Sequence, residues 1–331
     1  MDDETISTSE ERSSAKKLVV LGLVVGVPVS LAFLWLAIRN ADLDEVWDVA
    51  RSADVWLLAL ALLPIGALYV FQAARWRLLA ASTRPGLTGF VEMVLGAVAC
   101  NNVVPGRLGE LFRVRWLAVA APMPSGRAFA IVGLDRACDV VALFGLLLIS
   151  LPFVASPAWV ARIVVGAALL ILVLVAVLLA ARRYARRRHR DRHERGRLRR
   201  IARDLVDTLA EPLGRSRAAK ALSLSVGAWG SGAVAVWLVA RSIGIELDPL
   251  ECVFVTGVLN LGIAIPSSPG FVGTYQWLAV EALGVLGVGR EEALAFSILL
   301  HASWYVPTTV IGGYLMLFRI DWGLRGGEGR R

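Results

Sequence analysis

The sequence is poor in the residues that build metal sites, disulfide frameworks and charge-relay active sites. It has three Cys and three His among 331 residues. Cys100, Cys138 and Cys252 each lie in an apolar run, with neither the spacing of a zinc site nor a disulfide pattern, so we expect buried free thiols. The sequence also shows no nucleophile–base pattern and no phosphate-binding glycine loop. It therefore predicts no catalytic residue, no metal ion and no cofactor.

The histidines form no cluster, and the chain does not begin like a secretion signal. His189 and His193 belong to a basic tract, and His301 stands alone at the start of an apolar segment, where packing or a hydrogen bond is the expected role. Residues 1–17 are acidic and Ser-rich and lack a basic start. We interpret them as a disordered cytosolic tail.

Apolar residues, by contrast, dominate the chain. Hydrophobic residues make up 57% of it and the mean hydropathy is +0.65, far above the range of a soluble domain. Six segments are long enough to cross a hydrocarbon core of about 30 Å: residues 18–38, 55–74, 128–151, 158–181, 219–240 and 294–318. The sequence therefore predicts an all-α polytopic membrane protein.

Two further apolar runs are interrupted. Residues 87–103 run into a Pro-Gly pair, and residues 250–265 run into the segment PSSPGFVG. Each run has about sixteen residues, or roughly 24 Å of helix, which is marginal for a crossing. A second short apolar segment follows each break, at 108–121 and at 274–288.

Basic residues orient these segments. They flank the first two spans at Lys16, Lys17, Arg75, Arg77 and Arg84. The most basic tract, residues 182–200, follows the fourth span, and all these positions are predicted to be cytosolic. Residues 87–121 must then either cross twice or enter and return. We favour a re-entrant hairpin because the second arm carries Glu110, Arg113 and Arg115, which are costly on a lipid-facing helix.

The same reasoning places residues 250–288 in a second hairpin that enters from the outside, with both termini in the cytosol. Two hairpins from opposite faces are typical of inverted-repeat transporters, although here the correspondence rests on architecture alone. The predicted domains are the tail at 1–17, one transmembrane domain at 18–318 with a basic cytosolic loop at 182–218, and a cytosolic tail at 319–331.

The first break carries the chemistry of an internal binding site. Irregular backbone at membrane depth is tolerated only where protein or a water-filled cavity satisfies it. We therefore expect a polar site beside the residues of this break: Asn101, Asn102, Pro105, Gly106 and Arg107. Freed amides at the tip and at the start of the second arm could hold an anion. Arg107 and Arg113 could clamp phosphate oxygens, and Glu110 could pair with either.

A second polar group, LDRACDVV, lies within the span 128–151. Asp135 and Asp139 are four residues apart and share a helix face, and Arg136 follows Asp135 directly. Asp135 is about 12 Å from the cytosolic end of the span. Ionisable residues at that depth usually mark a transport pathway. The alternative is an ion-pair network that only locks helices together, for example Arg107 or Arg113 with Asp135.

The second break, PSSPGFVGTYQ, offers hydroxyl, glycine and amide groups but no charge. Its candidates are Ser267, Ser268, Pro269, Gly270, Gly273, Thr274 and Gln276. We expect either a neutral gate or headgroup cradle, or a plain helix break whose Ser hydroxyls cap the following helix. The Arg tract is expected to face anionic lipids, and nucleic acid is not an expected partner.

The three motifs together resemble one known family. NNVVPGRLGELFRVRWLA is similar to the N-x-x-P-x-R-x-G-E-x-x-R signature of the transmembrane domain of lysylphosphatidylglycerol synthases and their stand-alone flippase-like relatives. LDRACD is similar to the family's E-R-x-x-D element, with Asp135 where Glu is common. PSSPGFVGTYQ resembles its P-x-x-P-G-x-x-G segment, with Gln276 where one branch has Glu. The motifs occur in this order over residues 18–318.

The resemblance implies a helical domain of the bacterial cytoplasmic membrane that moves a lipid between leaflets. The matching residues become substrate-binding candidates: Asn102, Pro105, Arg107, Gly109, Glu110, Arg113, Arg136 and Asp139. Bifunctional relatives continue into a soluble aminoacyl-transferase domain. This sequence lacks that domain, so we expect no enzymatic activity.

The predicted function is transbilayer movement of a lipid with an anionic or phosphate-bearing headgroup, such as an aminoacylated phospholipid, a glycolipid or a polyprenyl-linked glycan. Arg107 and Arg113 would bind the phosphate, while Glu110, Asp135 and Asp139 would balance them and exchange protons. The alternative is a membrane-embedded enzyme or accessory subunit of lipid-linked glycan or glycolipid synthesis. Membrane lipids are the expected partners, with a second copy of the chain or a glycosyltransferase as candidate protein partners.

Overall fold

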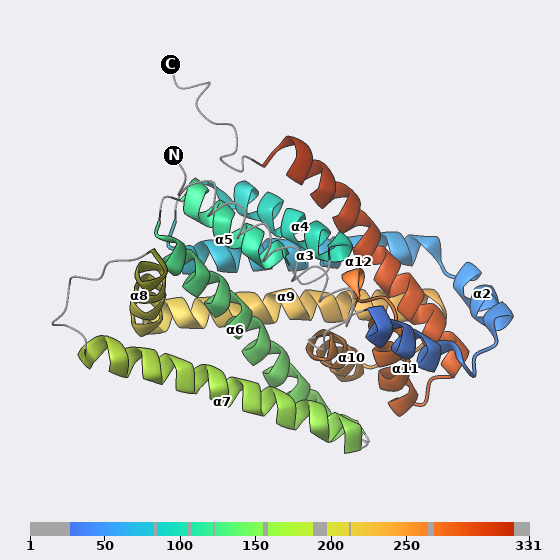
Figure 1. The fold of residues 1–331 in the computed structure, drawn as a ribbon. Helices are drawn as coiled ribbons and strands as arrows, with labels where there is room; N and C mark the ends of the chain where they lie inside the picture. The colour runs from blue at the N-terminus through green and yellow to red at the C-terminus, as the bar shows by residue number, and fades with distance from the viewer. Residues whose placement is uncertain are drawn as a thin grey trace.

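The computed structural model describes residues 27–320, apart from 83–84, 105–107, 122, 155–157, 188–196, 212 and 264–267. All regular elements in these residues are helices (Figure 1). Five are long and apolar enough to cross a membrane: Val55–Ala80, Ser125–Phe153, Val160–Ala181, Arg215–Ser242 and Arg290–Phe318. The prediction of an all-α polytopic membrane protein is therefore confirmed.

Five of the six predicted spans correspond to long helices. These are α3 (Val55–Ala80), α6 (Ser125–Ser150), α7 (Ala158–Arg187), α9 (Arg215–Ser242) and α12 (Arg290–Phe318). The first predicted span is described only from residue 27, as the helix Val27–Ile38. The predicted tail at 1–17, most of the tail at 319–331 and the middle of the Arg tract lie outside the described residues.

Shorter helices occur where the broken apolar runs were predicted. They are α4 (Leu87–Val103) and α5 (Gly109–Ala120) for the first run, and α10 (Pro249–Gly262), the 3-10 turn η2 (Pro269–Phe271) and α11 (Thr274–Val285) for the second. The remaining elements are α2 (Leu43–Arg51), the 3-10 turn η1 (Leu151–Phe153) and α8 (Arg197–Ala210). α4 contacts α5, and α10 contacts α11, so each broken run folds as a helical hairpin.

The start and the end of α3 both have local causes. The Asp54 carboxylate accepts a hydrogen bond from the backbone N–H of Trp56 at 2.8 Å, which caps the first turn. The predicted span ended at residue 74, but α3 continues to Ala80, because the residues after Arg75 are again mostly apolar. Arg75 therefore lies inside a membrane helix.

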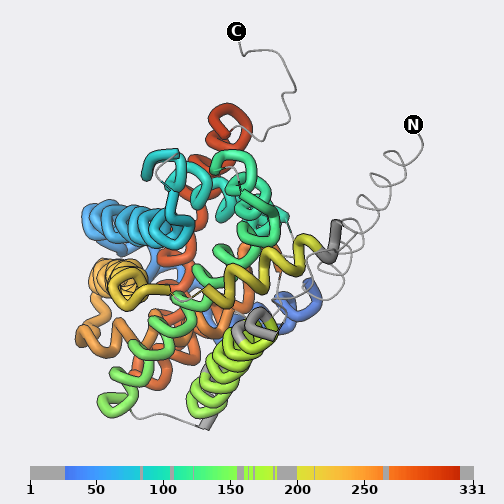
Figure 2. Tube along the Cα trace, turned by 90° about the vertical axis from the view of Figure 1, so that its left-hand side faces the viewer, coloured from blue at the N-terminus to red at the C-terminus, as the bar shows by residue number. Residues whose placement is uncertain are grey.

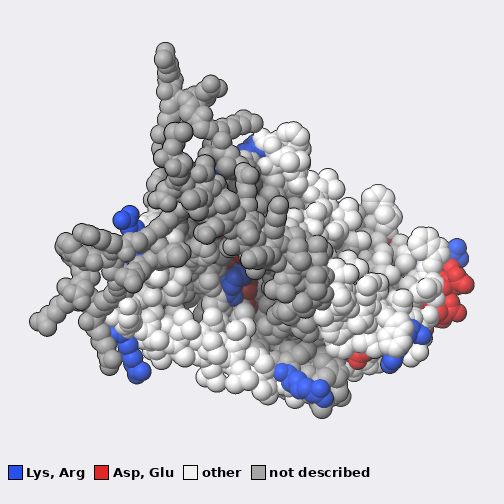
Figure 3. Space-filling model, viewed as in Figure 1, with Lys and Arg blue, Asp and Glu red and all other residues white. Residues whose placement is uncertain are grey.

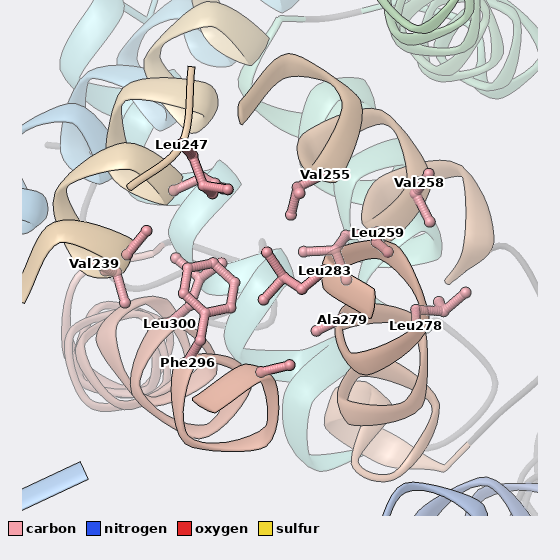
Figure 4. Close-up of a cluster of buried hydrophobic side chains, with 14 of the residues drawn as sticks. Val239, Leu247, Val255, Val258, Leu259, Leu278, Ala279, Leu283, Phe296 and Leu300 are labelled. Atoms are coloured by element: carbon pink, nitrogen blue, oxygen red, sulfur yellow. The ribbon is translucent and has the colours of Figure 1, made fainter. Parts of the chain in front are cut away.

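Two buried clusters hold the bundle together. In the larger cluster, Val239 of α9, Leu259 of α10, Leu283 of α11 and Phe296 of α12 point toward one another (Figure 4). The smaller cluster joins α3, α4 and α5 through three aromatic rings. The Trp76 and Phe90 ring centroids lie 5.0 Å apart, and those of Phe90 and Trp116 lie 5.3 Å apart.

The backbones of α5 and α12 approach α4 closely. A Cβ added to Gly109 of α5 would overlap the carbonyl oxygen of Ala97, and one added to Gly312 of α12 would overlap that of Leu95. Small residues that permit such contacts are typical of helix packing in membranes.

α7 lies at the edge of the bundle (Figure 2). It packs against α6, α8 and α10, and the described side chains of its most apolar stretch are all at least partly exposed. Val165, Leu169 and Leu172 are each more than half exposed. One side of α7 is therefore available to lipid.

Candidate functional site

Six ionisable side chains from three helices meet inside the bundle. They are Arg75 of α3, Glu110 and Arg113 of α5, and Asp135, Arg136 and Asp139 of α6. We call these six residues the charge network. Three guanidinium groups face three carboxylates, so the network carries no net charge when all six are ionised.

Arg75 was missed as a site residue, and its predicted position at a cytosolic flank is wrong. It is fully buried. Its Nε donates to Asp135 Oδ1 at 2.7 Å, and its Nη1 donates to Asp139 Oδ1 at 2.5 Å. The physical reason is that α3 extends past the predicted end, which brings Arg75 level with the acidic pair of α6. The apolar residues that follow Arg75 were the available signal.

Arg113 is held entirely by protein groups. Its Nη2 donates to Asp135 Oδ2 at 2.6 Å and its Nη1 to Glu110 Oε2 at 3.1 Å. Its guanidinium carbon lies 4.2 Å from the centroid of the Trp76 ring, a cation–π contact. The Arg113–Asp135 pair that the sequence suggested as a helix lock is present.

Arg136 is the accessible guanidinium of the network. Its side chain is 42% exposed, whereas that of Arg113 is 3% exposed and that of Arg75 is fully buried. Arg136 Nη2 donates to Asp135 Oδ2 at 3.0 Å and lies 3.3 Å from Asp139 Oδ2. Glu110, 29% exposed, approaches Arg136 Nη1 at 3.9 Å. Arg136 and Glu110 therefore form the exposed edge of the network.

α9 contributes two neutral partners that the sequence did not reveal. Trp229 Nε1 donates to Asp139 Oδ1 at 3.0 Å, and Ser225 Oγ accepts from Arg75 Nη1 at 2.8 Å. Ser225 and Trp229 are four residues apart and so share one face of α9, which was the only local signal for them.

A cavity of about 830 Å³ opens beside the network. Glu110, Arg113, Arg136 and Asp139 line it, whereas Asp135 does not. Most other lining residues are apolar or aromatic and come from α3, α4, α6, α7, α9, α10, α11 and α12. The volume falls within the usual range of about 300–1,000 Å³ for ligand sites. Figure 3 shows a group of acidic and basic side chains in the middle of an otherwise largely uncharged surface, over α6.

At the first break, the asparagine side chains form hydrogen bonds with the protein's own backbone and hydroxyl groups. Asn101 Oδ1 accepts from the Gly109 N–H at 2.8 Å. The amides at the start of α5 were predicted to help bind an anion, but this one already donates its hydrogen bond to a protein side chain. Asn102 Nδ2 donates to Thr309 Oγ1 at 2.8 Å and to Thr308 Oγ1 at 3.2 Å. Both asparagines line the cavity, and the predicted candidates Pro105 and Arg107 lie outside the described residues.

At the second break, left-handed glycines turn the chain into α11. Gly270 and Gly273 have φ angles of +68° and +88°, a conformation that favours glycine. The Gly273 N–H donates to Gln276 Oε1 at 2.7 Å, and Gln276 Nε2 donates to His301 Nδ1 at 2.8 Å. The hydrogen bond expected of His301 is thus present. Gln276, which stands where one branch of the family has Glu, thus links the start of α11 to α12.

The two breaks meet, and the described part of the second one reaches the cavity only through aromatic rings, those of Phe271 and Tyr275. The Tyr305 hydroxyl donates to the carbonyl oxygen of Asn102 at 3.3 Å, and the Tyr305 ring packs directly on Gly270. The Ser268 N–H donates to Ser30 Oγ at 2.7 Å. The described candidates of the second break, Ser268, Pro269, Gly270, Gly273 and Gln276, do not line the cavity, and Ser267 lies outside the described residues.

Comparison with protein families gives a match over most of the chain. The family model described as "Lysylphosphatidylglycerol synthase TM region" matches residues 19–312, which include the whole charge network and both breaks. A search of curated proteins gave no match. Among the described residues, no group of three or more His, Cys, Asp or Glu side chains is arranged to hold a metal ion.

Proposed function

Because the chain belongs to the family of lysylphosphatidylglycerol synthase transmembrane regions, we propose that it moves a phosphate-bearing lipid from one leaflet of the membrane to the other. The observation that carries this proposal is a cavity that is lined both by the charge network and by the lipid-exposed helix α7. The headgroup would occupy the network end of the cavity. The acyl chains would stay among apolar side chains and surrounding lipid.

We propose Arg136 as the residue that meets the phosphate. It is the most exposed guanidinium of the network, and a guanidinium matches phosphate oxygens with paired donors. Arg75 and Arg113 would act behind it, holding Asp135 and Asp139 in place. Arg107 stays a sequence-based candidate for the same anion.

The neutral balance of the network favours passage over tight capture. An incoming phosphate has to compete with Glu110 and Asp139 for Arg136. Conduction through a membrane needs binding that is favourable enough for entry and weak enough for release. The Arg136 guanidinium meets both conditions, because Glu110 and Asp139 pair with it again when the lipid leaves.

We propose that the α4–α5 hairpin enters from the cytosol and the α10–α11 hairpin from the outside of the bacterial cytoplasmic membrane. The distribution of charge supports this orientation. At the α2 end of the face in Figure 3, where Asp44, Glu45 and Asp48 lie, acidic side chains gather together with basic ones, whereas the charged side chains visible at the opposite end are basic. Basic residues mark the cytosolic side, so both termini would be cytosolic.

We also propose that the chain is a transporter without catalytic activity. Each carboxylate of the network has a guanidinium within 3.3 Å. A paired carboxylate is a weak general base, because its charge is already stabilised.

Reconstitution tests the transport proposal. The full chain and its Arg136→Gln variant are placed in liposomes with a fluorescent phosphatidylglycerol, and the label accessible to an impermeant reductant is followed over time. Arg136→Gln should slow transport by about tenfold or more, the value of one charge-assisted contact. Arg51→Gln, at an exposed position on α2, is the control and should transport normally. Parental transport by Arg136→Gln would refute the role of Arg136, and no transport by the unchanged chain would refute the function.

A further inference from the structure

We propose that α7 carries a second lipid site, in which Arg162 holds the phosphate of a membrane phospholipid and the space beside Gly166 takes one acyl chain. The inference rests on the proposed transport function, because it adds an access point to the same cavity. The site lies on a different helix from the charge network.

Three cavity-lining residues of α7 form one stripe. Arg162, Gly166 and Leu170 all line the cavity. They are spaced by four residues, so they lie one above the other on a single helix face. Val165 and Leu169 do not line the cavity and are each more than half exposed. Val165 and Leu169, three and seven residues after Arg162, lie on the same side of the helix, and Leu170 is itself 42% exposed, so this face of α7 borders both the cavity and the bilayer.

Arg162 brings an unpaired positive charge to this stripe of cavity-lining residues. Within the described residues, no carboxylate pairs with it, in contrast to the three arginines of the network. The network is neutral, so Arg162 is the uncompensated charge of the described cavity lining. An arginine near the membrane surface attracts anionic lipid headgroups. The charge of the lining therefore favours an anion at Arg162.

Gly166 leaves room next to that charge. A Cβ added at Gly166 would meet no atom within 4 Å. The lining nearby is apolar, with Leu170 of α7 and Val140 and Leu143 of α6. An open apolar space next to a cation suits an amphiphile better than a free inorganic anion, because burial of the chain adds to the affinity.

The position of Arg162 matches the headgroup level of a bilayer. It is four residues into α7, about 6 Å along the helix axis, whereas Asp135 lies deeper in α6. We therefore assign Arg162 to the outer mouth of the cavity, where a phospholipid of the outer leaflet enters or leaves.

Photolabelling tests the site. The full chain is placed in nanodiscs with phosphatidylglycerol that carries a diazirine on one acyl chain, and labelled positions are mapped by mass spectrometry. Label at Leu143 reports the cavity, since this residue is only 4% exposed and bulk lipid does not reach it. Label at Val310, which is 66% exposed on α12 and does not line the cavity, reports bulk lipid. Arg162→Gln and Gly166→Leu should each lower the Leu143 label about tenfold and leave the Val310 label unchanged.

Matched controls separate the site from general effects. Arg241→Gln, at an exposed arginine of α9, and Val175→Leu, two and a half turns beyond Gly166 and so on the opposite side of α7, should leave the Leu143 label unchanged. A diazirine diacylglycerol without phosphate should label Leu143 weakly in the unchanged chain. Full Leu143 label in Arg162→Gln, or equal labelling by the diacylglycerol, would overturn the phosphate assignment. Full label in Gly166→Leu would overturn the acyl-chain assignment.

The measurement reports occupancy, so it fails independently of the transport proposal. If Arg162→Gln loses the Leu143 label while the unchanged chain moves no lipid, the site stands and the transport function falls. If both α7 variants keep the label, the α7 site is wrong whatever the liposome result.

Discussion

Arg75 Nε lies 2.7 Å from Asp135 Oδ1, and both side chains are fully excluded from solvent. This pair ties α3 to α6. Asp135 also accepts hydrogen bonds from Arg113 and Arg136, so a single carboxylate contacts all three guanidinium groups. Asp135 does not line the cavity. Its position is that of a structural centre around which the accessible groups are arranged.

The first prediction concerns Asp135. Asp135→Asn should destabilise the protein by about 3–5 kcal/mol, because it leaves buried arginines without their shared counter-ion. Thermal unfolding in detergent measures the effect. Asp48→Asn, at an exposed position paired with Arg51, is the control and should change stability by less than about 0.5 kcal/mol. Equal melting temperatures for the two variants would contradict a central role for Asp135.

The second prediction separates transport from helix locking at Asp139. Asp139 lines the cavity, so water can reach the carboxylate. Asp139→Asn keeps an oxygen that can accept from Arg75 and Trp229, and it should cost about 1–2 kcal/mol, less than Asp135→Asn. Transport should nevertheless be lost.

Melting temperature and lipid flux are measured on the same preparation of Asp139→Asn. A large drop in melting temperature, with residual flux that follows only the amount of folded protein, would show that Asp139 is a structural lock. Asp139 would then leave the set of substrate-binding residues.

The third prediction concerns the contact between α4 and α5. Gly109→Ala should destabilise the protein by about 1–3 kcal/mol, because the added methyl group overlaps the Ala97 carbonyl and pushes α5 away from α4. The matched control is Gly133→Ala in α6, where an added Cβ meets no atom within 4 Å. There helix propensity predicts a gain of up to about 1 kcal/mol. Chemical denaturation curves of both variants test the difference in sign.

The fourth prediction concerns topology. In a background without the three native cysteines, Asp44→Cys should react with an impermeant maleimide in intact cells. Arg190→Cys should react only after the cells are opened, because the Arg tract is predicted to be cytosolic. Labelling at position 190 in intact cells would overturn the arrangement of two hairpins entering from opposite faces.

The parts of the network that follow from local spacing could be predicted from the sequence. Asp135 and Asp139 are four residues apart and share Arg75 as a partner, and Glu110 pairs with Arg113 three residues on. Helix geometry alone places such residues on one face. The two broken runs were equally visible, because proline and glycine interrupt otherwise apolar segments.

The parts that depend on how helices pack could not be predicted. Arg75 meets Asp135 only because α3 packs against α6, and Trp229 reaches Asp139 only because α9 lies next to both helices. Nothing in the sequence near Arg75 specifies those neighbours. The rule that basic residues flank cytosolic ends also pointed away from a buried arginine. The exposure of each arginine was hidden for the same reason, so the sequence pointed to Arg113 as a phosphate ligand, although Arg136 is the more exposed of the two.

The glycine contacts on α4 have a mechanical consequence. Gly109 and Gly312 bring the backbones of α5 and α12 against carbonyl oxygens of α4, with no side chain between them. Helices that touch at this level cannot slide past one another without steric overlap. α4, α5 and α12 must therefore rock as one rigid block in any alternating-access cycle. In the proposed transport, the hinge that opens the cavity to either leaflet would then lie elsewhere, and α7, which lies at the edge of the bundle and borders the cavity, is the candidate.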